Sequence, residues 1–322
     1  MKKISSYTID PINQLTLYGY KKYFNLFTDL FEKKKLPHCI LLSGPKGIGK
    51  STFAYHFVNS ILSKNEPNEY SLQTCQINEK NSSYNKVICG THPNFFRISS
   101  EEPNSQIKID QSRNLLQFLS KTTYTKNFKI VVIENIEYLN INASNAILKC
   151  LEEPSDNTFF FIIHNNSYEI LETIKSRSVF FKIHFSQKEK EVIFSKIIKN
   201  HYPELLNLNI NNSLYFNTPG DLIFQSFLIV NSNIDNNIDP YSLINFFLDK
   251  FSETKDIQIL NYASYYIEKF YLDLCISNSK KLNLYLKNYT RILNQINFIK
   301  KFNLSEKNSF IFIKDLLYNE AK

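Results

Sequence analysis

The segment GPKGIGKS at residues 44–51 constrains the fold of this chain more than any other feature. It directly follows the short apolar stretch HCILLS, and it opens a segment of helical periodicity that runs to residue 62. Three of its eight residues are glycines, in a chain that has only six. Glycines let the backbone curl so that successive N–H groups face an anion, and the N-terminal end of a helix adds positive partial charge. The pattern predicts a phosphate-binding loop between a strand and a helix.

Two side chains of this loop carry chemistry. Lys50 is placed to reach the β and γ phosphates of a nucleotide, and the Ser51 hydroxyl to ligate Mg²⁺. The alternative is a glycine-rich turn with no ligand. The motif alone indicates a nucleoside triphosphate but not a purpose, since small-molecule kinases, motors and switches share it.

Composition sets wider limits on the class of protein. The chain has 322 residues, enough for two or three domains, and its 43% hydrophobic content argues against global disorder. Its net charge of +8 permits contact with nucleic acid, although a lysine-rich composition explains the charge equally well. The lysines of 280–301 are accordingly interpreted either as a nucleic-acid contact or as a solvated helix face.

Cysteine usage and the N-terminus bear on location. The five cysteines are odd in number and scattered, which suits reduced thiols rather than a disulfide framework: Cys39, Cys75, Cys89, Cys150 and Cys275. The opening MKKISSYTID has no apolar run after its lysines, so it is not a signal peptide, and no stretch has the roughly 18 apolar residues of a membrane span. We therefore expect a cytoplasmic protein that does not enter a membrane.

Strands alternate with helices over residues 38–185, which predicts a parallel sheet covered on both faces. The helix over 107–120 is expected to be capped by Asp110, and the helix over 142–154 by Asn142. Residues 64–86 are polar and lack periodicity, so we expect an exposed excursion there. Beyond 186 the helical signals dominate, and the fold class is α/β plus all-α. The expected strands are 38–43, 94–99, 129–134, 158–164 and 179–185. The remaining expected helices are 20–35 and 51–62.

Several longer stretches carry a resemblance to a known family. These are GTHPNFF (90–96), KIVVIENIEYLNINASNAILKCLEEP (129–154) and ETIKSRSVFF (172–181), in a fixed order after the phosphate loop. Over residues 15–225 the chain resembles the clamp loader subunits of bacterial DNA polymerase III, most closely the delta-prime type, and is thereby similar to AAA+ ATPases. The resemblance implies an AAA+ P-loop domain (1–185), a small helical lid (186–232) and a C-terminal helical collar (233–322).

The resemblance also implies ligands and partners. ATP and Mg²⁺ are the expected cofactors. The expected partners are the gamma/tau and delta subunits in a hetero-pentamer, the sliding clamp, and primed DNA through the assembly.

Site residues follow by position from the resemblance. Glu134 holds the place of the Walker B metal-binding Asp, and with Ser51 it is expected to bind Mg²⁺; an ordinary solvated strand end is the alternative. Asn135 stands where an active ATPase has its catalytic Glu, and an amide cannot act as a base. The site is therefore expected to bind nucleotide more than to hydrolyse it. The expected Walker A residues are Gly44, Pro45, Lys46, Gly47, Ile48, Gly49, Lys50, Ser51 and Thr52.

Two further positions match functional places of the family. Asn165 falls at sensor 1, where a polar side chain reads the γ-phosphate, although Asn also forms turns readily. Arg177 aligns with the arginine finger that such subunits point into a neighbour's ATP, since a planar guanidinium stabilises spreading phosphoryl charge. A surface arginine paired with a nearby Glu is the alternative, because Ser178 replaces the usual Cys.

The chain departs from the family pattern in two places. Asp221, in TPGDLIF, stands where an arginine senses nucleotide in cis, and a carboxylate there repels phosphate. The zinc module of many relatives is reduced to Cys75 and Cys89, which with His92 do not complete a tetrahedral site, so no zinc is expected.

We therefore expect a delta-prime-like subunit that holds ATP and lends Arg177 to a neighbour. One alternative is a gamma/tau-like ATPase motor. The other is a P-loop kinase with a small-molecule pocket near residues 64–106.

Overall fold

The computed structural model describes residues 10–100, 105–121, 128–154, 157–205, 217–231, 239–302 and 306–321. The chain divides into two compact units. The first runs over Met1–Leu206 and Asn211–Phe227, and the second over Asn207–Ile210 and Leu228–Lys322. The predicted boundary at 232/233 lies outside the described residues. The division into three domains stays a prediction.

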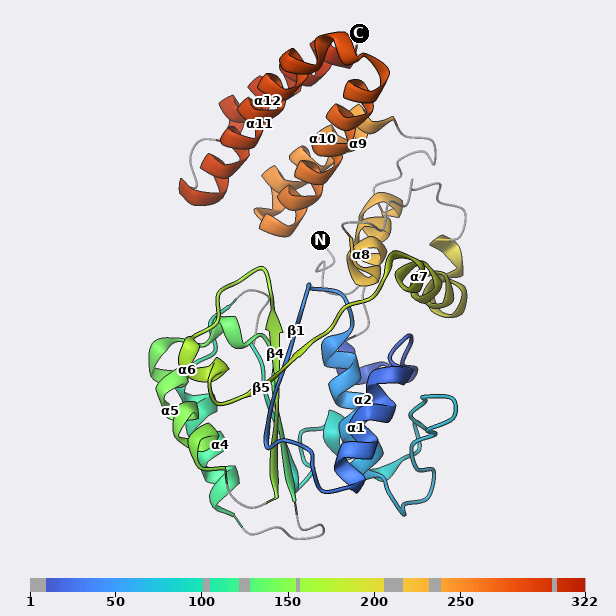
Figure 1. Cartoon of the computed structure of the whole chain (residues 1–322), viewed down its shortest axis with the longest axis vertical. Helices are drawn as coiled ribbons and strands as arrows, with labels where there is room; N and C mark the ends of the chain where they lie inside the picture. The colour runs from blue at the N-terminus through green and yellow to red at the C-terminus, as the bar shows by residue number, and fades with distance from the viewer. Residues whose placement is uncertain are drawn as a thin grey trace. The chain divides into compact units, whose positions relative to one another are not determined.

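A five-stranded parallel sheet organises the first unit, in the order β2-β3-β4-β1-β5 (Figure 1). The strand that precedes the phosphate loop, β1, pairs with β4 on one side and with β5 on the other. This order places β4 between β1 and β3, so the strand ends that carry Gly44, Asn165 and Glu134 lie along one edge. The bounds are β1 (Cys39–Gly44), β2 (Phe95–Ile98), β3 (Lys129–Ile133), β4 (Thr158–Asn165) and β5 (Val179–Lys182).

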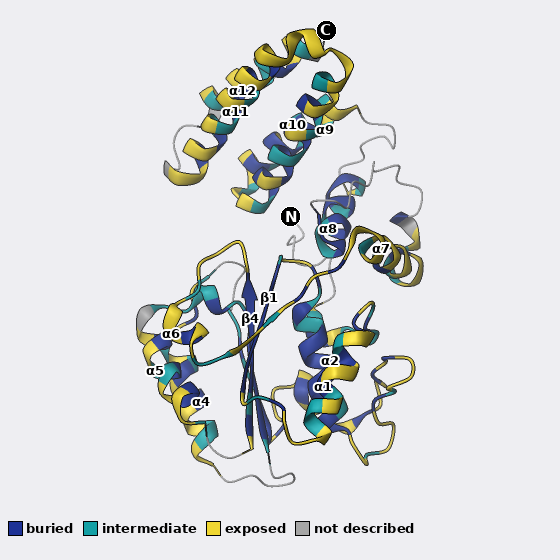
Figure 2. Cartoon of the chain, in the orientation of Figure 1, coloured by how far each residue is buried: buried dark blue, intermediate teal, exposed yellow. Residues whose placement is uncertain are grey.

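Helices cover both faces of this sheet, as predicted (Figure 1). One face carries α1 (Lys21–Glu32) and α2 (Lys50–Leu62), and the other carries α4 (Ile109–Ser120), α5 (Ile141–Glu152) and α6 (Glu172–Lys175). All residues of β1 and β3 are buried, with alternate side chains pointing into the two cores. Figure 2 shows these strands as the buried centre of the unit.

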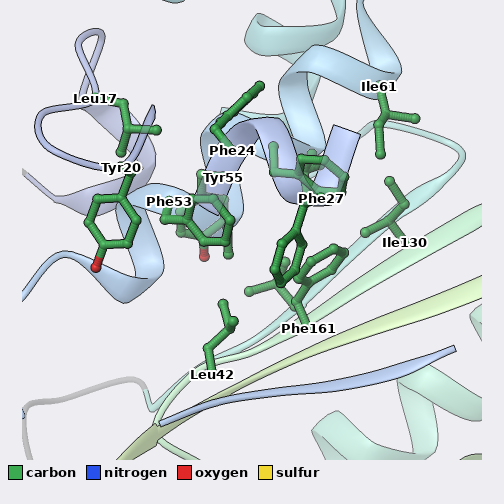
Figure 3. Close-up of a cluster of buried hydrophobic side chains, with 14 of the residues drawn as sticks. Leu17, Tyr20, Phe24, Phe27, Leu42, Phe53, Tyr55, Ile61, Ile130 and Phe161 are labelled. Atoms are coloured by element: carbon green, nitrogen blue, oxygen red, sulfur yellow. The ribbon is translucent and has the colours of Figure 1, made fainter. Parts of the chain in front are cut away.

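Aromatic side chains fill the core between α1, α2 and the sheet (Figure 3). Phe27 of α1 meets Phe53 edge to face with ring centroids 5.1 Å apart, and Phe57 at 5.6 Å. Phe57 in turn lies 5.6 Å from Phe161 of β4. Such ring pairs contribute about 0.5–1.5 kcal/mol each beyond the burial of their area, so this cluster fixes α2 firmly on the sheet.

Two predicted helix caps were each wrong by two residues. Asn140, with an extended backbone, caps α5 by accepting a 2.7 Å hydrogen bond from the N–H of Ala143, so Asn142 lies inside the first turn. Lys108 occupies the N-cap position of α4, and Asp110 lies in its first turn. Several polar residues precede each helix, and the tertiary position of the chain decides which one caps it.

Most residues of the segment 64–86 are exposed, as expected, but several of them are buried within the first unit. Tyr70, Ile77 and Tyr84 are buried there, and α3 (Ser82–Ile88) packs on α2. The polar residues of this segment satisfy one another inside the fold: Ser83 donates a 2.6 Å hydrogen bond to Glu66. The sequence did not reveal this buried part, because the hydrogen bond joins residues 17 positions apart.

Helices dominate the rest of the chain. A capping box formed by Ser186 and Glu189 starts α7 (Gln187–His201), and α8 (Pro219–Val230) follows. In the second unit α9 (Pro240–Thr254), α10 (Ile257–Ser277), α11 (Leu282–Phe302) and α12 (Glu306–Ala321) each pack against two of the others. Within the described ranges none of the helices is both long and apolar enough to cross a membrane. Short 3₁₀ turns are η2 (Pro11–Asn13), η3 (Ile136–Tyr138), η4 (Pro203–Leu205) and η5 (Ser279–Lys281).

Candidate nucleotide site

The predicted phosphate loop lies between β1 and α2. Gly47 and Gly49 have φ angles of 77° and 98°, a backbone region that favours glycine. Gly49 holds the N-cap position, so the first N–H groups of α2 lack carbonyl partners within the helix. The Tyr20 hydroxyl donates a 3.0 Å hydrogen bond to the carbonyl of Ile48 and so supports the loop. The loop therefore presents a helix N-terminus on a firmly supported backbone.

Lys50 is buried at the start of α2 and folds back on the loop. Its ammonium group donates 2.8 Å hydrogen bonds to the carbonyls of Gly44 and Pro45. Burial lowers the pKa of Lys50 to about 8, while the negative charges of Glu137 and Asp221 act to raise it. The lysine therefore has both the position and the charge to hold phosphate, and its surroundings already contain two carboxylates.

A cavity of about 150 Å³ lies beside the loop. Its walls are mainly aromatic and aliphatic, as in sites that take planar organic groups. The position next to the phosphate loop suits the base and sugar of a nucleotide. The lining residues are Gln14, Thr16, Leu17, Tyr18, Tyr20, Gly47, Ile48, Gly49, Thr52, Ile193, Ile197, Tyr202, Pro219, Gly220 and Ile223.

The first turn of α8 lies directly against the phosphate loop. The Thr218 hydroxyl oxygen lies 2.8 Å from the carbonyl oxygen of Lys46. The N–H of Gly220 donates a 3.0 Å hydrogen bond to the carbonyl of Gly47. A Cβ atom on Gly220 would lie 2.9 Å from the Cα of Gly47, so both backbones need glycine there. Asp221 is held at this contact because its backbone N–H donates a 3.3 Å hydrogen bond to the Thr218 hydroxyl, and its carboxylate lies 2.8 Å from the same oxygen.

Glu134, the predicted magnesium ligand, is engaged inside the fold. One carboxylate oxygen accepts a hydrogen bond from the Tyr55 hydroxyl, and the other forms a 3.2 Å ion pair with Arg97 of β2. Ser51, the other predicted ligand, is half-buried in the first turn of α2. No group of three or more His, Cys, Asp or Glu side chains that could hold a metal occurs in the described part of the chain. Ser51 fits a nucleotide-bound Mg²⁺, whereas Glu134 would have to share its charge with Arg97.

Asn135 adopts a left-handed backbone, with φ 50° and ψ 58°. Its carbonyl accepts a 2.9 Å hydrogen bond from the N–H of Tyr138, which closes the turn η3 after β3. Asn tolerates this conformation better than Glu does. The backbone thus gives a structural reason for Asn at the position where the resemblance implies a catalytic Glu in active ATPases.

Glu137 is a site residue that the sequence motifs did not identify. Its carboxylate accepts a 3.3 Å hydrogen bond from the backbone N–H of Asn165. Burial raises the pKa of Glu137, and the Asn165 N–H, His164 and Lys50 oppose the rise. A carboxylate placed just beyond the end of β3, at the same edge of the sheet as the phosphate loop, was the signal that could have identified it.

Asn165, the predicted sensor 1, ends β4 opposite Gly44 of β1. Its side-chain oxygen accepts a 3.2 Å hydrogen bond from the N–H of Ser167, so it also forms the turn that the alternative reading expects. The neighbouring His164 contacts the Ser43 hydroxyl at 3.0 Å and the carbonyl of Tyr168 at 3.0 Å. Both ring nitrogens of His164 thus have structural partners.

Arg177 follows α6, and α6 and α2 cover opposite faces of the sheet (Figure 1). Its guanidinium donates a 2.8 Å hydrogen bond to the carbonyl of Thr173 and forms an ion pair with Glu152 at the end of α5. The surface pair of the alternative reading is therefore present. A role as an arginine finger stays a prediction.

Comparison with known proteins gives this architecture a family. A family model described as "DNA polymerase III, delta subunit" matches residues 19–187, just over half of the chain. The subunit delta' of DNA polymerase III from Pseudomonas aeruginosa is 35% identical over 154 residues, which are 48% of this chain and 45% of that protein. The chain thus spans less than half of this relative's length.

Two further relatives cover more of the chain. The subunit delta' of DNA polymerase III from Buchnera aphidicola (subsp. Acyrthosiphon pisum) is 24% identical over 295 residues, 90% of this chain and 85% of that protein. The crystal structure of a DNA polymerase III gamma subunit-related protein from Thermotoga maritima covers 93% of this chain and 99% of its own, with a TM-score of 0.52 and 16% identity. This likeness confirms the predicted AAA+ fold with a helical C-terminal region. The chain belongs to the DNA polymerase III delta subunit family, as a member of the delta-prime type.

Proposed function

We propose that this protein is a delta-prime-like subunit of the bacterial clamp loader, which helps to load the sliding clamp on primed DNA. Family membership is the observation that supports this proposal. The protein works in the cytoplasm as a largely rigid member of a hetero-pentamer with gamma/tau and delta subunits.

The nucleotide site of this subunit holds ATP with magnesium and turns it over slowly. Lys50, the glycines of the loop and Ser51 support binding. Slow turnover is supported by Asn135, whose amide cannot take a proton from an attacking water, and by Glu134, whose charge is shared with Arg97. The bound magnesium would neutralise phosphate charge, and the protein would hold it through Ser51.

Arg177 contributes to the active site of a neighbouring gamma/tau subunit. The position of α6 on the sheet face opposite α2 supports a role in trans rather than at its own phosphate loop. In this proposal Arg177 leaves Glu152 for the phosphates of the neighbour, where a guanidinium contributes about 10³-fold or more to the rate.

The first test uses the isolated protein. It is titrated with a fluorescent ATP analogue while phosphate release from ATP is followed, and Lys50→Ala serves as the variant without the phosphate-binding ammonium. Micromolar binding that Lys50→Ala abolishes, with negligible release, is the expected result. Robust release from the wild type would instead favour a gamma/tau-like motor, which the complete phosphate-loop motif permits.

The second test uses the loader reconstituted with gamma/tau and delta subunits. Arg177→Ala should lower DNA-stimulated ATP hydrolysis by the complex, because one neighbouring site loses its trans guanidinium. Arg113→Ala, at an arginine that is 66% exposed on α4, is the matched control and should leave hydrolysis unchanged. Equal rates for both variants would refute the finger assignment.

A further inference from the structure

Two carboxylates from different elements lie in the surroundings of the phosphate-binding lysine. Glu137 comes from η3, after β3, and Asp221 comes from the first turn of α8. Both act electrostatically on Lys50. Glu137 is thereby part of the surroundings of the phosphate loop, although it lies three positions beyond the predicted magnesium ligand Glu134.

Backbone contacts fix Glu137 at this place. Its carboxylate accepts the 3.3 Å hydrogen bond from the N–H of Asn165, and Asn165 is the β4 partner of Gly44 in β1. The carbonyl of Gly44 in turn accepts the 2.8 Å hydrogen bond from Lys50. The carboxylate and the ammonium group are thus anchored on paired residues of two adjacent strands.

Asp221 is fixed independently of Glu137. The Thr218 hydroxyl oxygen lies 2.8 Å from both the Asp221 carboxylate and the carbonyl of Lys46, which share its one hydrogen, and the N–H of Gly220 donates to the carbonyl of Gly47. These contacts hold the start of α8, with its acidic side chain, against the phosphate loop itself.

The carboxylates of Glu137 and Glu134 have different kinds of partner. Glu134 is balanced by Arg97 at 3.2 Å, whereas Glu137 accepts its 3.3 Å hydrogen bond from a neutral amide. The lysine of a phosphate loop reaches the β and γ phosphates. A carboxylate held beside that lysine competes with these phosphates for it, and repels most strongly the ligand with the larger negative charge.

We propose that Glu137 is a specificity-determining residue of this phosphate site, which disfavours a nucleoside triphosphate relative to a nucleoside diphosphate. Asp221 acts in the same direction from the side of α8. This inference rests on the proposed nucleotide binding of the chain. It goes further because it assigns the preference among nucleotides to a residue outside the loop motif.

The test measures dissociation constants of ATP and ADP, with magnesium in excess, for the full chain and its variants. Glu137→Gln removes the charge and keeps the size of the side chain. It should tighten ATP binding about tenfold and change ADP binding less than about threefold. Glu32→Gln, at an exposed position near the end of α1, makes the same change in net charge and should leave both constants as in the wild type.

Asp221→Asn is the second variant, and it decides the question if Glu137→Gln does not fold by circular dichroism. It should shift the ratio of the ATP and ADP constants in the same direction. An unchanged ratio in folded variants that still bind nucleotide overturns this inference and leaves nucleotide binding intact. Failure of the wild type and of every variant to bind either nucleotide overturns both, whereas binding gained only by Glu137→Gln or Asp221→Asn supports the inference.

Discussion

Tyr55 donates its hydroxyl hydrogen to the buried carboxylate of Glu134. Tyr55 lies on α2, one turn beyond Ser51. Burial, together with the negative charge of Glu134, raises the pKa of Tyr55 well above its usual value. Arg97 completes the group at 3.2 Å from the second carboxylate oxygen. A position where the resemblance implies a metal ligand is thus part of the internal packing between α2, β2 and β3.

We expect Arg97→Ala to lower the free energy of unfolding by about 2–3 kcal/mol, because Glu134 keeps a buried charge without its cation. Arg113→Ala is the matched control, since Arg113 also pairs with a carboxylate at 3.2 Å but is 66% exposed, against 29% for Arg97. The control should cost no more than about 0.5 kcal/mol. Urea unfolding followed by circular dichroism measures both, and equal small losses would show that the buried pair does not stabilise the fold.

Gly47→Ala should destabilise the first unit more than Gly90→Ala does. Both glycines have positive φ angles, 77° and 67°, so each substitution carries a backbone penalty of about 1–2 kcal/mol. A Cβ atom at Gly47 would also lie 2.4 Å from the hydroxyl oxygen of Thr218, whereas Gly90 has open space around it. Thermal unfolding should therefore show a lower midpoint for Gly47→Ala. Identical midpoints would mean that the start of α8 moves aside without cost.

The stability of the first unit should fall in mild acid because of His56. Burial lowers the pKa of His56 to about 3, against a small opposing effect of its hydrogen bond to Gln14. In the unfolded chain the imidazole of His56 binds a proton near pH 6.5, whereas in the folded chain it stays neutral until about pH 3. The contribution of neutral His56 to the free energy of unfolding is therefore complete above pH 6.5 and is lost as the pH falls toward 3. Between these two pH values the free energy of unfolding should fall by about 1.4 kcal/mol per pH unit.

His56→Gln is the variant that isolates this effect, because glutamine keeps a donor and an acceptor but does not titrate. The free energy of unfolding, measured by urea titration at several pH values, should fall less steeply in the variant than in the wild type. Parallel pH profiles would exclude His56 as the cause.

Asn135→Glu restores the acidic residue of an active ATPase, and we still expect no gain in phosphate release. The neighbouring Glu134 remains engaged with Arg97, and a glutamate in the left-handed backbone of residue 135 costs about 1–2 kcal/mol of stability. Asn135→Gly, which suits the same backbone, is the control and should retain stability. Robust release from Asn135→Glu would instead show that this single residue disables the site.

Local patterns in the sequence predicted the phosphate loop and the alternation of strands and helices. The loop motif depends on glycines, a lysine and a hydroxyl within eight residues, and neighbours in sequence determine its shape. The parallel sheet followed from the same local signals, because apolar runs separated by helices have few other ways to bury both faces.

Contacts between distant segments could not be predicted in the same way. Arg97 reaches Glu134 because β2 pairs with β3 in a register that sets Ile98 opposite Ile133, and register is a property of the assembled sheet. Glu137 acquires its place from Asn165, 28 residues later in the chain. The sequence places Glu137 86 positions after the last residue of the loop motif, so it could not show that this carboxylate acts on Lys50.

Tyr20 stacks on Phe53 with ring centroids 5.1 Å apart, and its hydroxyl holds the carbonyl of Ile48. The shape of the phosphate loop is thereby set by an aromatic core that forms when the protein folds. A ligand that arrives meets a loop that needs no ordering, so little conformational entropy is lost on association. For the proposed nucleotide, we therefore expect the rate of association to depend on diffusion and on the charges at the entrance rather than on motion of the loop.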